Sequence, residues 1–193
     1  SEEQRQKSKD GFVIEQVDGI DGWSGIGMMA IANTRVVRRS VALMEQNQKS
    51  YGTNFTFGEH GLFSTKRMAR LASYGSIIAF LVLATPLKRL VRPLLPKPGE
   101  GPSQETQDKG WFRATFVAYA EDNERKICSM YGSGDPGYKS TAKLVCESAL
   151  SLARSNELPG GSEYGGVLTP AVGLGDVLIE RLRNKEIEFK VLH

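Results

Sequence analysis

Residues 111–131 read WFRATFVAYAEDNERKICSMY, and this stretch decides the fold class. Both of its ends are rich in aromatic and β-compatible residues, whereas residues 121–124 (EDNE) are typical of a turn. The pattern predicts two antiparallel strands, residues 111–120 and 126–131, joined as a hairpin. Residues 187–191 (IEFKV) alternate strictly between apolar and polar side chains, which predicts a half-buried strand. We expect that strand to join the sheet of the hairpin, because an orphan strand is unstable.

Helical periodicity surrounds these strands. Residues 28–46 and 138–154 read as helices, and Thr169-Pro170 is typical of a helix start, with Thr as the N-cap and Pro at the first helical position. The sequence therefore predicts an α+β fold with an antiparallel or mixed sheet and about four helices. The sequence also predicts two short strands, at residues 12–17 and 54–57. A glycine-rich loop is expected at residues 19–27 and a proline-rich connector at residues 93–102.

The helix at residues 138–154 has two expected faces. Leu144, Val145 and Leu152 belong to a broad apolar arc, which we expect to face the core. Glu147 and Ser151 belong to the polar face, which we expect to face solvent.

Composition limits the function classes. The 193 residues suit one domain with an appendage, which we divide into a connector at residues 1–27 and an α+β domain at residues 28–193. The net charge of +3 is too slight to indicate a nucleic-acid partner. Two histidines and two cysteines, Cys128 and Cys146, predict neither a metal site nor a disulfide scaffold, and we expect both thiols to be buried and reduced. The charged start lacks both Met and an apolar stretch, from which we expect no signal peptide and a processed or truncated start.

Charge is concentrated in one window. Residues 60–99 contain seven Lys and Arg residues and no acidic residue, so this window is +7 while the rest of the chain is −4. Within it, residues 71–87 (LASYGSIIAFLVLATPL) carry no charge over seventeen residues, the lower limit for crossing a bilayer.

The segment 66–97 therefore has three interpretations. It is a membrane-surface segment with basic flanks, a helix buried in the core or against a protein partner, or a true span. The candidate contact residues for a membrane or partner are Lys66, Arg67, Arg70, Phe80, Leu81, Lys88, Arg89 and Arg92.

Two further sequence patterns concern ligand binding. Arg35, Arg38 and Arg39 share one helical face by their spacing and are candidates to clamp an anion such as a phosphate or an acyl-carrier group. The alternative is a face that is solvated or that pairs with acidic residues elsewhere in the fold. The glycine order Gly22-x-x-Gly25-x-Gly27 does not match the G-x-G-x-x-G dinucleotide turn. No catalytic set is visible, so the catalytic residues are unknown.

Four blocks of sequence stand out along residues 28–192. They are residues 32–40 (ANTRVVRRS), 95–103 (LPKPGEGPS), 134–138 (GDPGY) with 141–143 (TAK) and 147–150 (ESAL), and 165–171 (GGVLTPA) with Gly175-Asp176 and 179–182 (IERL). In this order the blocks resemble the C-terminal half of the saccharopine dehydrogenase-like oxidoreductases, including their trans-acting enoyl reductase branch.

The resemblance implies the substrate-side, membrane-facing domain of an NAD(P)-dependent oxidoreductase that acts on a lipid-related substrate. The family's Rossmann half and its glycine fingerprint are absent here, so we expect no cofactor in this chain and a dinucleotide-binding N-terminal half or partner subunit. The expected location is intracellular and membrane-associated: lipid droplet, mitochondrion or plastid. The alternative is a non-catalytic structural or membrane-docking subunit of a larger complex, derived from that family.

Overall fold

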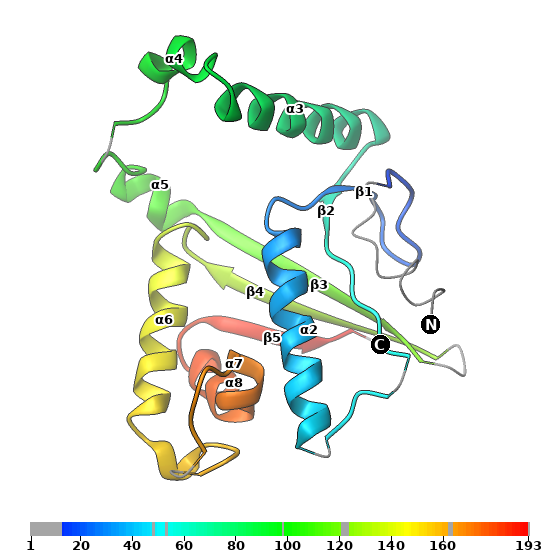
Figure 1. The fold of residues 1–193 in the computed structure, drawn as a ribbon, viewed down its shortest axis with the longest axis vertical. Helices are drawn as coiled ribbons and strands as arrows, with labels where there is room; N and C mark the ends of the chain where they lie inside the picture. Colours follow the sequence, from blue (N-terminus) through cyan, green and yellow to red (C-terminus); the bar gives the residue numbers. More distant parts are fainter. Residues whose placement is uncertain are drawn as a thin grey trace. The chain divides into compact units, whose positions relative to one another are not determined.

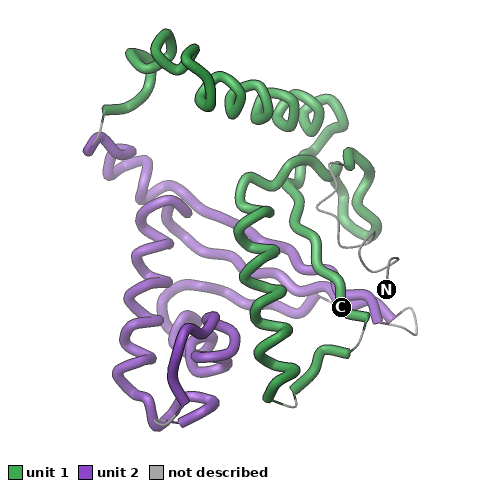
Figure 2. The backbone as a smooth tube through the Cα atoms, viewed as in Figure 1, with its two compact units in different colours: residues 1–98 green, residues 99–193 purple. Residues whose placement is uncertain are grey.

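The computed structural model describes residues 13–47, 49–52, 54–97, 99–120, 124–161 and 164–192. The chain divides into two compact units, residues 1–98 and 99–193 (Figure 2). Their boundary falls within residues 93–102, where the sequence predicts an irregular connector. The predicted division between residues 1–27 and 28–193 stays a prediction.

The second unit is built on a three-stranded antiparallel sheet in the order β3-β4-β5 (Figure 1). The strands are β3 (Trp111–Tyr119), β4 (Arg125–Ser133) and β5 (Ile187–Val191). β3 and β4 form the predicted hairpin, whose turn at residues 121–123 lies outside the described residues. β5 pairs with β4, so that Phe189 lies opposite Met130. The predictions of the hairpin, of the third strand and of an α+β fold are confirmed.

Helices complete this unit: α5 (Gln104–Lys109), α6 (Lys139–Leu152), α7 (Pro170–Gly173) and α8 (Gly175–Arg183), with a 3-10 turn at Ser155–Glu157. α6 and α8 lie side by side, and α8 leads into β5 (Figure 1). The helix predicted to begin at Thr169-Pro170 is broken at Leu174 into α7 and α8. The buried apolar side chains of the unit are Val172, Leu174, Leu182 and Ile187.

The expected faces of α6 were wrong. Val145 and Leu152, placed in the apolar arc, are 62% and 60% exposed. Glu147 and Ser151, placed on the polar face, are buried. The reason is that the polar face has partners inside the unit: Glu147 pairs with Arg181 of α8, and the Ser151 hydroxyl donates to the Glu147 carbonyl. Cys146 is also exposed, contrary to the expected buried thiol, while Cys128 is half-buried.

The first unit contains a two-stranded antiparallel sheet, β1 (Trp23–Ile26) with β2 (His60–Phe63), and helix α2 (Ala30–Gln46). β1 falls within the predicted loop at residues 19–27. The strand predicted at residues 54–57 is not formed, and β2 follows it instead. In the predicted strand at residues 12–17 only Gln16 pairs, through an isolated bridge to Trp23; residue 12 lies outside the described residues.

The first unit ends with α3 (Lys66–Ala84), α4 (Lys88–Val91) and a 3-10 turn (Arg92–Leu94). Seven α-helices are found in the described parts of the chain, and four of them, α2, α3, α6 and α8, are longer than two turns. These four match the number of helices predicted, and the others are short.

Candidate functional site

The first turns of α3 are fixed to the β1–β2 sheet. Thr65 caps the helix by accepting a hydrogen bond from the Met68 amide at 3.2 Å. Ala69 and Ser73 are fully buried, and the Ile26 amide of β1 donates to Ser73 Oγ at 3.0 Å. Gly25 makes this close approach possible, because a Cβ there would lie 2.8 Å from both Ser73 Oγ and the Phe63 ring. The start of α3 is therefore held by packing and by a buried hydrogen bond.

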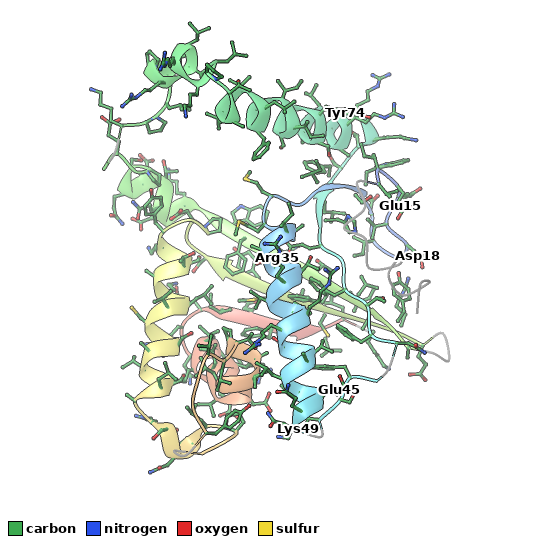
Figure 3. The ribbon with its side chains drawn as sticks, viewed as in Figure 1. Glu15, Asp18, Arg35, Glu45, Lys49 and Tyr74 are labelled. Carbon is green, nitrogen blue, oxygen red and sulfur yellow. The ribbon has the colours of Figure 1, made fainter. Side chains whose placement is uncertain are left out.

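The rest of α3 is apolar and exposed around its whole circumference. Between residues 74 and 84 only Val82 is half-buried, and every other residue is exposed. Phe80 and Leu81, predicted as contact residues, are 70% and 54% exposed. Figure 3 shows side chains projecting away from α3 in several directions, with Tyr74 toward its N-terminal part. Only 11% of the most apolar window of this helix is buried, and by length and composition it could cross a membrane.

The predicted cations lie at both ends of this apolar stretch. Lys66, Arg67 and Arg70 are exposed in the first turns of α3, and the Lys66 ammonium sits 4.8 Å from the centre of the Trp23 ring. At the other end, α4 and the turn after it expose three cations beside apolar residues: Lys88, Arg89 and Arg92 beside Leu90 and Leu94. The predicted contact residues thus lie on α3, on α4 and in the 3-10 turn, three consecutive elements of the first unit.

The stripe Arg35, Arg38 and Arg39 lies on the exposed face of α2, opposite its buried residues Thr34, Ser40 and Leu43. Figure 3 shows Arg35 in the first half of α2, far along the helix from Glu45. Arg38 and Arg39 take part in other interactions, so this stripe is not an empty anion clamp.

The glycines of residues 22–27 do not form a cradle for a pyrophosphate. A dinucleotide turn needs open space above its glycines so that the phosphates can approach the backbone. Here the space at Gly22 is filled by the Leu62 side chain, and the space at Gly25 by Phe63 and Ser73. These residues therefore do not fit NAD(P), in agreement with the mismatch in glycine spacing.

Two ion pairs join α6 to the elements around it. Arg181 Nη2 lies 2.8 Å from Glu147 Oε2, and the Glu147 side chain is 7% exposed. Lys143 Nζ donates to Glu186 Oε2 at 2.8 Å, and the Ser133 hydroxyl donates to the same oxygen. The hydrogen bonds from Lys143 and then from Ser133 hold the pKa of Glu186 below its ordinary value.

A third polar cluster lies at the start of α6. The Asp135 carboxylate accepts three backbone hydrogen bonds, from the amides of Gly137, Tyr138 and Lys139, and thereby caps the start of α6. Lys139 Nζ pairs with Asp108 at 2.6 Å, and the hydrogen bonds from Lys139 and Gln104 lower the pKa of Asp108. These three polar clusters connect elements of the second unit. Because their charged groups are paired or hydrogen-bonded within the fold, we assign them a structural role.

In the part of the chain that the structure describes, no group of three or more His, Cys, Asp or Glu side chains is arranged to hold a metal ion. No nucleophile with an adjacent base is found in the interactions described above, and the catalytic residues stay unassigned.

No protein-family model matches the chain, and no solved structure matches it. Among curated proteins it is 36% identical over 168 residues to a protein of Mycobacterium tuberculosis (strain H37Rv) that is named a trans-acting enoyl reductase. It is 35% identical over 169 residues to the trans-acting enoyl reductase of Mycobacterium bovis (strain BCG), and 34% identical over 168 residues to that of Mycobacterium ulcerans.

Each match covers 83% of this chain and 39% of the relative. The chain thus spans about two fifths of the length of the curated relatives it matches. Over most of its own length it is similar to proteins named trans-acting enoyl reductases.

Proposed function

We propose that this chain forms the substrate-side, membrane-facing part of an NAD(P)-dependent oxidoreductase of the saccharopine dehydrogenase-like class. Its substrate is lipid-related and carries an enoyl group. The observation that carries the proposal is the similarity to trans-acting enoyl reductases over 83% of the chain.

In this proposal the dinucleotide is bound by an N-terminal half or a partner subunit and not by these 193 residues. The chain covers only 39% of its relatives, which leaves room in them for a further domain. The filled space at Gly22 and Gly25 gives NAD(P) no place at the glycine turn of residues 22–27. The bound nicotinamide would supply the hydride from that other part, and the contribution of this chain is to bind and orient the substrate.

The lipid-related substrate is supported by the exposed apolar half of α3, since an enzyme that meets a lipid surface can draw its substrate from it. Arg35, Arg38 and Arg39 remain the candidate contacts for an anionic group of the substrate. Arg35 is the clearest of them, because Arg38 and Arg39 already have interactions in the fold.

A second candidate function is a non-catalytic subunit of a larger membrane complex. The observation that favours it is the exposed apolar face of α6, with Val145 and Leu152 at about three fifths exposure, which a protein partner would cover.

Intact-mass analysis and N-terminal sequencing of the protein purified from its source separate these two functions. A chain that continues into a dinucleotide-binding domain, or copurifies with one, supports the oxidoreductase. NAD(P)H oxidation with an enoyl thioester should then require both parts. Copurification with a membrane complex that holds no dinucleotide-binding chain would contradict it and support the second function.

Calorimetric titration of the isolated 193-residue chain with NADPH provides the matching control. We expect affinity no better than millimolar, because Leu62, Phe63 and Ser73 occupy the space above the glycines. Micromolar affinity would overturn the assignment of the cofactor to another part.

A further inference from the structure

We propose that residues 66–94 bind the surface of a bilayer rich in anionic lipid from one side. In this arrangement residues 74–84 lie among the acyl chains of one leaflet, and the cations at both ends of the segment bind lipid phosphates. The inference rests on the membrane-facing part of the proposed function and is independent of its oxidoreductase part.

The first argument is the exposure of residues 74–84. A helix that is apolar on all sides is normally buried, either in a protein core or in a membrane. Here Ile78, Phe80 and Leu81 are all more than half exposed, and Phe80 lies on nearly the opposite side of the helix from Ile78, because they are two residues apart. Removal of apolar surface from water is favourable at roughly 25 cal/mol per Å², so this stretch requires a non-aqueous cover.

The second argument is charge, which indicates what the cover is. Residues 60–99 carry seven cations and no acidic residue, while the remainder of the chain has a net charge of −4. Six of the cations lie in the two clusters that flank the apolar stretch: Lys66, Arg67, Arg70, Lys88, Arg89 and Arg92. Apolar surface between two cationic clusters complements an anionic lipid surface, which has phosphates above and acyl chains below.

The third argument is length, which separates one-sided binding from a span. Because Ala69 and Ser73 are buried and Ser73 is hydrogen-bonded to β1, the first turns of α3 stay with the folded unit. The eleven residues 74–84 then extend roughly 16 Å at 1.5 Å per residue. This is about half of the ~30 Å hydrocarbon core, too short to carry the cations that follow it to the opposite headgroups, so the stretch lies along one leaflet.

The fourth argument is the turn that follows. Thr85 ends α3 in an extended conformation, and its hydroxyl donates to the Val82 carbonyl at 3.1 Å. Pro86 follows, and α4 then places Lys88 and Arg89 beside the exposed Leu90. A short helix that mixes cations with apolar residues suits the headgroup boundary, so both ends of the segment lie on the same side of the bilayer.

Flotation of the full chain with vesicles of phosphatidylcholine, with and without phosphatidylserine, tests binding. We expect the wild type to float only with the anionic vesicles. Lys88→Ser with Arg89→Ser and Arg92→Ser should weaken binding on the order of 100-fold, because each near-surface cation contributes about fivefold, and should make the remaining binding less sensitive to salt. The matched control removes three exposed lysines elsewhere, Lys49→Ser with Lys109→Ser and Lys126→Ser, and should float like the wild type.

A second pair of variants tests how much the apolar side chains of residues 74–84 contribute to vesicle binding. Phe80→Asp with Leu81→Asp should abolish flotation at every salt concentration, because two carboxylates would enter the acyl region. The control Val145→Asp with Leu152→Asp changes residues of similar exposure on α6 and should float normally. Circular dichroism checks that all variants are folded.

Depth and sidedness are measured in single-cysteine chains, all with Cys128→Ser, and with Cys146→Ser wherever Cys146 is not itself the labelled residue. A fluorophore on Phe80→Cys should be quenched by spin-labelled lipid and shielded from aqueous iodide. For sidedness, Glu45→Cys and the native Cys146 are each tested as a single cysteine with an impermeant maleimide, after the protein is added outside the vesicles. Both should be labelled if the segment enters one leaflet.

The outcomes separate the failures. Equal flotation of folded wild type and all variants rejects membrane contact through residues 66–94. No flotation at all rejects membrane contact and with it the membrane-facing part of the proposed function. Flotation with one cysteine protected shows a span and overturns the one-leaflet mode while membrane contact stands. None of these results changes the NAD(P)H assay, which tests the oxidoreductase part separately.

Discussion

Helices α3 and α6 both expose large apolar side chains, yet they differ in what surrounds those side chains. In α6 the exposed residues form one face, and the opposite face is held by the buried pair Glu147–Arg181 and by Lys143–Glu186. In α3 only the start is buried, and the second half is exposed on all sides. α6 is therefore an ordinary surface helix with an apolar outer face, whereas half of α3 has no face toward its own unit.

The charge around the two helices differs in the same way. α3 and α4 lie in a window without acidic residues, while α6 is bordered by Asp108, Asp135 and Glu186 as well as by lysines. An outer face bordered by both signs of charge suits a protein partner, and an apolar stretch between cations suits anionic lipid. Exposed apolar area alone therefore does not identify a partner, and the charge at its borders is the observation on which we base the proposed ones.

The largest effect in water is expected at the buried face of α6. Arg181→Ala leaves the Glu147 carboxylate buried without its partner, which should cost about 3 kcal/mol in the free energy of unfolding. The double change Glu147→Leu with Arg181→Met should recover most of that loss. Urea denaturation measures both, and a single variant as stable as the wild type would show that the pair does not fix α6 to α8.

A smaller loss is expected where α3 meets β1. Gly25→Ala places a methyl group 2.8 Å from the Phe63 ring and Ser73 Oγ, and such overpacking typically costs about 2 kcal/mol. The exchange of the amides of residues 66–73 with deuterium should rise in this variant. Glycine to alanine at Gly75, where a Cβ meets nothing within 4 Å, is the matched control and should not destabilise the chain. If Gly25→Ala changes neither the stability nor the amide exchange of residues 66–73, the start of α3 is not anchored on β1.

The Asp pairs at the two exposed surfaces should barely change stability in water. Phe80→Asp with Leu81→Asp, and Val145→Asp with Leu152→Asp, each replace side chains that are more than half exposed, so each change should be within about 0.5 kcal/mol per residue. Thermal unfolding without lipid measures this. If the α3 double variant is unfolded while the α6 double variant is as stable as the wild type, residues 74–84 pack inside the protein.

The smallest effect is expected from the pH dependence at Glu186. Because its pKa is lowered in the folded state, this carboxylate stabilises the fold above the pKa of the unfolded chain, and that stability is lost as the pH falls through the folded value. Glu186→Gln should therefore lose slightly less stability than the wild type between pH 7 and pH 3. Urea denaturation at the two pH values measures the loss in free energy of unfolding. An equal loss in the wild type and in Glu186→Gln would contradict the Lys143–Glu186 contact. Since the pair is exposed at Glu186, the difference should be small.

The strands of the second unit could be predicted because their signals are local. Alternation at residues 187–191 and the turn residues between β3 and β4 do not depend on distant partners. The faces of α6 could not be predicted in the same way. The partner of Glu147 is Arg181, far along the chain, and periodicity alone assigns a charged face to solvent. The four longer helices were found, while the break at Leu174 was not.

The first unit shows the same limit. β1 lies in a glycine-rich stretch that has the composition of a loop, and it forms a strand because Gly25 and Gly61 let Phe63 and Ser73 pack closely against it. The cationic and apolar candidates at residues 66–94 were predictable from charge and hydropathy. The division of α3 into an anchored start and an exposed remainder was not, because it depends on the hydrogen bond between Ser73 and Ile26.

The most direct test of the account is amide hydrogen exchange of the full chain with and without vesicles that contain phosphatidylserine, comparing residues 74–84 of α3 with α6. Without lipid, we expect residues 74–84 to exchange faster than α6, because they have few buried contacts. Anionic vesicles should protect residues 74–84 and leave α6 unchanged, while phosphatidylcholine alone should change neither. Unaltered exchange in residues 74–84, or protection confined to α6, would contradict the assignment of α3 to a lipid surface.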